Sequence, residues 1–154
     1  GGRVGLIRQD MRARWNVLVQ VFDEATGEVL EEQRVHNIVT TVGLTEIGRR
    51  VALIAPPGED QFAVGDGDTA PTLNDTALEN QLYLGQISRA EGGASGSVFR
   101  FVLPSTELDG STIKEVGLFT SEDLMIARAV LTTPQTKTAG KGIAFIWQWT
   151  FANA

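Results

Sequence analysis

Hydrophobic and polar residues alternate most regularly in two segments near opposite ends of the chain. One side of residues 15–22 carries four apolar residues: Trp15, Val17, Val19 and Val21. One side of residues 142–151 carries five: Ile143, Phe145, Trp147, Trp149 and Phe151. A period of two is typical of β-strands with one buried face. A turn at residues 23–27 then leads into a returning strand that ends at Val39, so residues 15–39 predict a β-hairpin.

The spacing changes to that of a helix in residues 40–55. Apolar residues recur there at intervals of three and four: Leu44, Ile47, Val51 and Ile54. Such a stripe is typical of an amphipathic helix, and Thr40 and Thr41 are both suitable N-caps. Because proline cannot continue a helix, the Pro-Pro-Gly sequence at 56–58 ends the pattern. We expect one long α-helix over residues 40–55.

Short extended segments separated by turn residues follow in the second half of the chain. Strands are expected over residues 62–64, 83–89, 98–103, 113–119, 124–131 and 142–151. The sequence Thr76-Ala-Leu-Glu79 has the spacing of a capping box, which predicts one helical turn. Residues 132–141 are polar and are expected to form a loop.

Together these patterns predict a mainly β fold. The expected architecture is a β-sandwich or barrel-like domain of about eight strands with one α-helix. The 154 residues correspond to one domain. We place this domain at residues 15–154, with its sandwich at 61–154, and expect a basic N-terminal arm at 1–14 before it.

Charge is distributed unevenly between the arm and the rest of the chain. The net charge of −6 argues against nucleic acid as a partner. Residues 1–14 have a local charge of +3, whereas residues 15–154 have 18 acidic and 9 basic residues, a local charge of −9. The arm is either a solvated terminus or an assembly element that lies on an acidic neighbouring subunit. Its contact residues would then be Arg3, Leu6, Ile7, Arg8, Met11, Arg12 and Arg14.

The residue types that carry most metal and redox chemistry are scarce. The chain has no cysteine and one histidine, His36, which excludes a disulfide framework, a thiolate metal site and a histidine relay. The loop Gly65-Asp-Gly-Asp68 lacks the third acidic position of a calcium loop, so a tight turn is the preferred interpretation. No apolar run reaches the ~18 residues of a membrane span. We expect no metal, no cofactor and no membrane partner.

One acidic and one basic residue lie within otherwise apolar strands. Glu115 and Arg128 stand at nearly equal distances from the turn at 121–123, so they can meet as cross-strand partners. An unpaired charge among apolar neighbours is costly, which favours a structural ion pair that fixes the strand register. The alternative, a carboxylate general acid or base, lacks a second carboxylate at a useful spacing. We therefore expect no enzyme; a depolymerase would need two carboxylates in a cleft.

The segment 124–131 is apolar on both sides apart from Arg128. A strand of this kind is covered on both faces. In a domain of this size, we expect one of the two covers to come from a neighbouring subunit.

Several short motifs occur in a fixed order along the chain. They are Thr41-Val-Gly-Leu44, Ala63-Val-Gly-Asp-Gly67, Asp75-Thr-Ala-Leu-Glu-Asn80, Gly110-Ser-Thr-Ile-Lys-Glu-Val-Gly-Leu-Phe119 and Leu124-Met-Ile-Ala-Arg128. In this order they resemble a domain of tailed-bacteriophage structural proteins, the tail-collar fibre proteins. Gln81 and Lys114 depart from the acidic residue and the arginine that are common in that pattern.

The resemblance implies a structural subunit of the virion, assembled in the host cytoplasm. Its partners would be copies of itself in a homotrimer and other virion proteins of the tail, baseplate or capsid. A tail fibre, tip or baseplate-type attachment subunit is the first interpretation. A capsid decoration (cement) protein is the alternative, which a basic arm and an acidic body would suit. A carbohydrate- or receptor-binding module is a further alternative, motivated by Trp15, Trp147 and Trp149.

Overall fold

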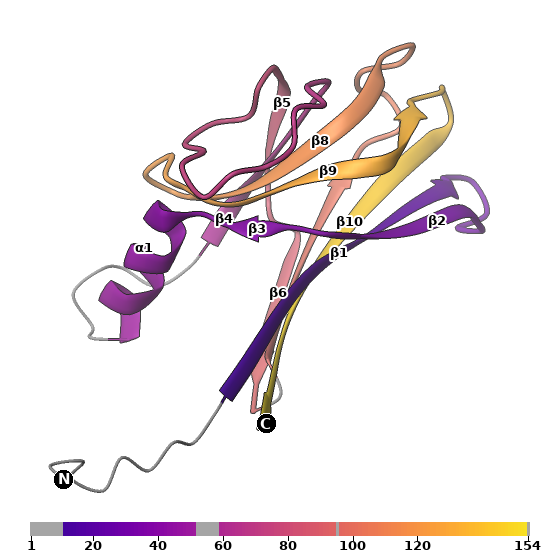
Figure 1. Ribbon diagram of the computed structural model, residues 1–154. Helices are drawn as coiled ribbons and strands as arrows, with labels where there is room; N and C mark the ends of the chain where they lie inside the picture. Colours follow the sequence, from indigo (N-terminus) through magenta and orange to yellow (C-terminus); the bar gives the residue numbers. More distant parts are fainter. Residues whose placement is uncertain (1–10, 52–58, 95, 154) are drawn as a thin grey trace, which may run out of the picture.

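The protein folds into two antiparallel β-sheets packed face to face. A computed structural model describes residues 11–51, 59–94 and 96–153. The described residues form ten strands and one helix, with five strands in each sheet. The strand order is β2-β1-β10-β7-β6 in the first sheet and β3-β9-β8-β4-β5 in the second (Figure 1). The mainly β fold with one helix is confirmed, with ten strands where about eight were expected.

The first sheet combines strands from both ends of the chain with two from its middle. They are β1 (Met11–Asp23), β2 (Val29–His36), β6 (Arg89–Gly93), β7 (Gly96–Leu103) and β10 (Lys141–Asn153). β1 forms a hairpin with β2 and pairs with β10 along its whole length, from Met11 opposite Asn153 to Asp23 opposite Lys141. The two ends of the described chain therefore lie side by side at one end of this sheet (Figure 1).

The second sheet is built from the remaining strands. They are β3 (Ile38–Val39), β4 (Glu59–Gly65), β5 (Gln81–Gln86), β8 (Thr112–Thr120) and β9 (Met125–Thr136). The expected strand over 83–89 is instead divided between β5 and β6, which lie in different sheets. The expected loop over 132–141 was also wrong in part, since β9 continues to Thr136. Threonine is β-branched and suits a strand even where the segment is polar.

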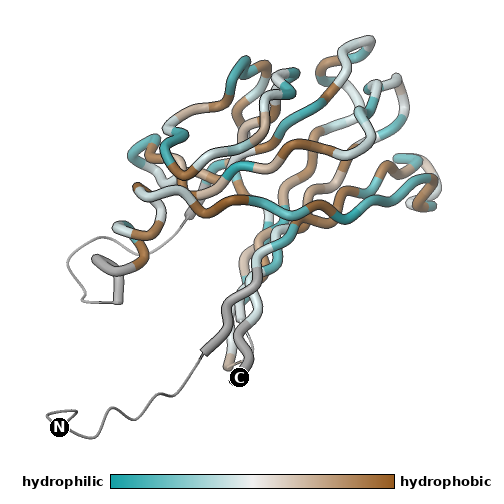
Figure 2. Tube along the Cα trace, viewed as in Figure 1, coloured by the Kyte–Doolittle hydropathy of each residue, from teal (hydrophilic) through white to brown (hydrophobic). Residues whose placement is uncertain are grey.

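The core between the sheets is aromatic at its centre. The ring of Phe62 on β4 lies 5.2 Å from that of Phe101 on β7 and 5.7 Å from that of Trp147 on β10, measured between ring centroids. Val17 and Val19 of β1 are buried beside them, as the alternation predicts. Buried and less buried positions alternate along β7 of the first sheet, which turns one apolar face inward, whereas β8 and β9 of the second sheet are buried at consecutive positions. Figure 2 shows how hydrophobic and hydrophilic residues are distributed along the strands.

The helix α1 (Thr41–Val51) begins where the chain leaves β3. Thr40 is its N-cap: the hydroxyl accepts a hydrogen bond from the Gly43 amide at 2.9 Å and donates to the Met125 carbonyl at 2.7 Å. The predicted apolar stripe was wrong at Leu44, whose side chain is 57% exposed. The helix instead turns Gly43 and the buried Glu46 towards the sheet. No described helix is long and apolar enough to span a bilayer.

Close packing explains why the helix has a glycine at position 43. A Cβ atom on Gly43 would lie 2.2 Å from the carbonyl oxygen of Ile126, so only glycine lets the helix backbone rest on β9. On the same outer face of the second sheet, Leu78 packs with Ala63, Phe119 and Met125. Both faces of β9 are thus covered by the chain itself. The expectation that a neighbouring subunit supplies one cover for residues 124–131 was wrong.

Candidate functional site

The long loop between β4 and β5, residues 66–80, crosses the outer face of the second sheet above two buried charged residues. Glu115 on β8 is fully buried, and Arg128 on β9 is 3% exposed. The strand register places Gly117 opposite Arg128 and Val130 opposite Glu115. Glu115 and Gly117 are two residues apart and therefore share a face of the sheet. The Arg128 side chain meets Glu115 diagonally across the pair of strands.

The structure brings the two charges into direct contact. The Nε atom of Arg128 donates to Oε2 of Glu115 at 2.9 Å, and Nη2 lies 2.9 Å from the same oxygen. The Nη1 atom of Arg128 reaches the loop, donating to the Thr69 carbonyl at 2.9 Å and to Oδ2 of Asp75 at 3.1 Å. One guanidinium thus joins β8, β9 and two points of the loop. Burial strengthens such charge-assisted hydrogen bonds, because water does not compete for them.

Glu115 holds the loop through its backbone. Oε1 accepts hydrogen bonds from the amides of Gly67 at 3.1 Å and Asn80 at 2.8 Å, and Oε2 accepts one from the amide of Glu79 at 3.0 Å. A buried carboxylate needs such partners to offset its desolvation. These bonds join the beginning and the end of the loop at one side chain. We call the group formed by Glu115, Arg128 and Asp75 the loop clamp.

Two glycines let the backbone come close enough to the clamp. A Cβ atom on Gly65 would lie 2.1 Å from the Asn80 carbonyl oxygen and 2.6 Å from Oε1 of Glu115. A Cβ atom on Gly67 would lie 2.3 Å from the Glu79 side chain and 2.8 Å from the same carboxylate oxygen. Both contacts are impossible for a larger residue without a shift of the loop. The Gly-Asp-Gly sequence is therefore required by the clamp.

The acidic residues of the loop have partners within the loop or close to it. Asp66 accepts from the side-chain amide of Asn80 at 2.6 Å, and Asp68 lies 3.8 Å from the amine of Lys114. Within the described residues, no three His, Cys, Asp or Glu side chains are grouped so that they could hold a metal ion.

Hydrogen bonds change the acidity of two loop carboxylates. Burial acts to raise the pKa of Asp75, but hydrogen bonds from Thr72 and the hydrogen bond and charge of Arg128 outweigh it and hold the pKa below its ordinary value. Hydrogen bonds from Thr69, whose amide donates at 2.9 Å, lower the pKa of Glu79. Glu79 was expected to close a capping box over 76–79. That prediction was wrong: its carboxylate binds Thr69, and no helical turn forms.

The clamp has the chemistry of a structural element. A surface hollow of about 310 Å³ lies beside it, lined by Thr69, Asp75, Ala77, Glu79 and Arg128. Glu115 is fully buried beneath the loop, and both of its oxygens already accept hydrogen bonds. A general acid or base must instead reach a substrate proton. The geometry therefore supports a role in holding the loop to the sheet.

The other residues singled out from the sequence lie elsewhere. Arg3, Leu6, Ile7 and Arg8 of the expected arm are outside the described residues, whereas Met11, Arg12 and Arg14 belong to β1. Trp147 is fully buried, so it offers no surface to a sugar. The rings of Trp15 and Trp149 lie against each other, with centroids 4.6 Å apart.

The sequence predicted the contact between Glu115 and Arg128 but not the groups of the loop that bind them. Asp75, Thr69 and the amides of Glu79 and Asn80 were not expected to meet Glu115 and Arg128, although the fixed order of short motifs contained all but Thr69. That order was the available signal, since each motif supplies one part of the contact: the glycines, the loop's end, the acid and the arginine.

One comparison with known proteins gives a match. A family model described as phage tail-collar fibre protein, N-terminal, matches residues 32–144, a range that contains the whole second sheet, β6 and β7 of the first sheet, and the whole clamp. Neither a curated protein nor a solved structure matches the chain.

Proposed function

The chain belongs to the phage tail-collar fibre family, in the N-terminal part that the family model describes, and from this premise we propose that it is a homo-oligomeric attachment domain that joins a tail fibre to the tail. The family is one of phage tail structural proteins, so the chain is a virion component. The attachment of a fibre to the tail is the part that we propose. In this proposal, the sandwich provides surfaces for binding other tail proteins and further copies of the chain.

The loop clamp is the observation that carries this proposal. It uses the motifs of the family to fix a 15-residue loop, 66–80, to the outside of a sheet, through five hydrogen bonds to Glu115 and Arg128. A loop held in this way keeps one shape, which lowers the entropy lost when a partner binds to it. An assembly that must be rigid benefits from such a surface.

The partners in this proposal are copies of the chain, most simply in a homotrimer, and neighbouring tail or baseplate proteins. Assembly would take place in the host cytoplasm before the virion is complete. The basic residues Arg3, Arg8, Arg12 and Arg14, with Leu6, Ile7 and Met11, would contact an acidic surface of a neighbouring subunit. Charge complementarity supports this contact, since residues 15–154 have a local charge of −9.

The alternatives have less support. The family match describes a fibre protein and not a capsid decoration protein. A carbohydrate- or receptor-binding module would need exposed aromatic rings, but Trp147 is fully buried in the core, and Trp15 and Trp149 are only partly exposed and lie against each other.

Virions made without this protein would test the proposed position. A phage with a stop codon in this gene, grown in a non-suppressing host, should yield particles whose heads are complete and whose tails lack fibre density in cryo-electron micrographs. Particles that keep their fibres but lose density from the capsid surface would contradict tail attachment and favour decoration.

A further inference from the structure

The outer face of the first sheet is left uncovered by the described residues, unlike that of the second sheet. The strand register places one residue from each of its five strands in a single row across this face: Arg34, Leu18, Ile146, Arg100 and Arg89. Three arginines thus flank two apolar residues. Arginine next to apolar side chains is typical of protein interfaces, where its stem packs and its guanidinium pairs with acids.

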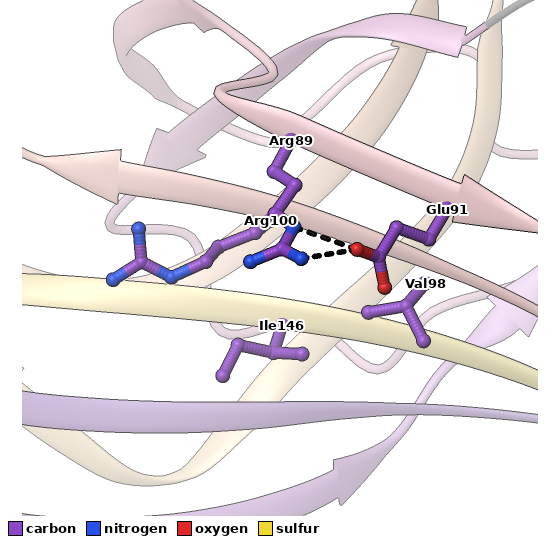
Figure 3. A pocket seen from close by; sticks show the side chains of 5 residues that line it. All are labelled: Arg89, Glu91, Val98, Arg100 and Ile146. Carbon is purple, nitrogen blue, oxygen red and sulfur yellow. Dashed lines mark hydrogen bonds and ion pairs between the residues drawn. The ribbon is translucent and has the colours of Figure 1, made fainter.

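Two of these arginines stand directly opposite each other. Arg89 on β6 pairs in register with Arg100 on β7, and like charges in this position repel. Arg89 is bound to Glu91 on its own strand. In Figure 3 the Arg100 guanidinium points away from that pair, beside Ile146. No side-chain hydrogen bond or ion pair joins Arg100 to another described residue, although it lines a hollow of about 180 Å³ with Val98 and Ile146. Among the residues that the structure describes, this half-buried cation has no anionic partner.

The opposite side of the sandwich is acidic. It carries the clamped loop, with Asp66, Asp68, Glu79 and the neighbouring turn residues Glu122 and Asp123. The side chain of Asp68 is 73% exposed, and Leu73 of the same loop is exposed as well. Arg128 and Glu115 are buried beneath it and neutralise each other. One basic side chain, Lys114, lies 3.8 Å from Asp68. The carboxylates outnumber it, so this surface offers to a partner a net negative charge and an apolar residue on a rigid support.

We propose that the outer face of the first sheet binds the clamped 66–80 loop of a second copy of the chain, with Arg100 facing the loop's carboxylates. The inference rests on the proposed homo-oligomeric function and names the surfaces that would form it. Because the two surfaces lie on opposite sides of one subunit, the contact is head to tail. Such a contact closes into a ring where the rotation between successive subunits closes, and otherwise extends into a filament; in both, an inner subunit uses both of its faces.

Charge reversal in the full chain tests this contact. The variants are Arg100→Glu, Asp68→Arg and the double variant with both changes. Matched controls are Lys141→Glu and Glu28→Arg, which reverse charges at other places. Sedimentation velocity at several protein concentrations gives the assembly constant, and circular dichroism shows that each variant is folded. Each single reversal should weaken assembly roughly tenfold or more, a modest effect for a close interfacial charge pair. The double variant should recover most of the loss, while the controls should assemble as the wild type does.

The other outcomes separate the two proposals. A wild type that assembles, together with an Arg100→Glu variant that assembles equally well, would overturn this inference and leave the homo-oligomeric function standing. Loss of assembly in Arg100→Glu but not in Asp68→Arg would show that the sheet face binds something other than the loop, which also overturns it. A wild type that stays monomeric would overturn homo-oligomeric assembly itself, whereas tail attachment is decided separately by the virions without the protein.

Discussion

Replacing Glu115 with glutamine isolates the contribution of the loop clamp to stability. The side chain keeps its shape but loses its charge. In the native protein Oε1 accepts from the amides of Gly67 and Asn80, and Oε2 accepts from Arg128 and the amide of Glu79. The single side-chain oxygen of glutamine can accept either the hydrogen bonds now made to Oε1 or those made to Oε2, but not both. Its NH₂ group must then face donors, and Arg128 loses its fully buried counterion and keeps the partly exposed Asp75 in direct contact.

The size of the effect follows from burial. Breaking a buried ion pair by removing one partner costs about 3–5 kcal/mol. The whole free energy of unfolding of a domain is typically about 5–15 kcal/mol, so this loss is a large part of it. With an m-value of about 2 kcal/mol per molar urea, the midpoint of unfolding should fall by roughly 2 M. Tryptophan fluorescence can follow the transition, since Trp147 is buried in the core.

Two further variants make the test specific. Lys114→Gln removes the neighbouring charge, whose ion pair with Asp68 is 3.8 Å long and partly exposed, and should cost about 0.5 kcal/mol or less. In the double variant Glu115→Gln with Arg128→Met, the buried charges are both removed, and the Asp75 carboxylate that loses Arg128 is partly exposed and still accepts from Thr72, so the double variant should be more stable than Glu115→Gln alone. Equal urea midpoints for Glu115→Gln and Lys114→Gln would refute this account of the clamp.

Three more predictions follow from contacts described above. Gly67→Ala should lower stability by about 1–3 kcal/mol, because its Cβ would clash beneath the loop, whereas Gly93→Ala, with open space around it, should leave the melting temperature nearly unchanged. Asp75 has a pKa below its ordinary value of 3.8, so its stabilising effect is complete above that pH and is lost as the pH falls through the lowered pKa. Urea titrations below pH 3.8 should therefore show a weaker pH dependence in Asp75→Asn, and an unchanged slope would contradict the assignment. Thr40→Ala should cost about 1 kcal/mol as a lost N-cap, measured by thermal unfolding against the exposed Thr41→Ala.

The strands with regular alternation could be predicted from the sequence because their pattern reports burial directly. Val17, Val19, Phe145 and Trp147 all face the core as their spacing indicates. The assignment of strands to sheets could not be predicted in this way. β5 and β6 follow each other with only two residues between them, yet they lie in different sheets, and no local pattern marks the crossing.

The helix shows where amphipathic spacing misleads. Leu44 fits the apolar stripe but is exposed, because Gly43 brings the helix backbone against the Ile126 carbonyl and so decides which side faces the sheet. The clamp shows a different limit. Counting residues from the short turn at 121–123 was enough to predict that Glu115 lies near Arg128, since both flank that turn. It could not supply the amides of a loop some 35 to 50 residues earlier in the chain.

The pairing of Met11 with Asn153 at one end of the first sheet has a mechanical consequence. If force is applied between the two ends of the chain, it pulls β1 and β10 apart at that end. Their hydrogen bonds run perpendicular to the strands and would break one pair after another, as in unzipping, instead of resisting together in shear. The sandwich is therefore weak when stretched through its own termini. A tail under tension would have to carry its load across the faces of this domain, from one subunit to the next.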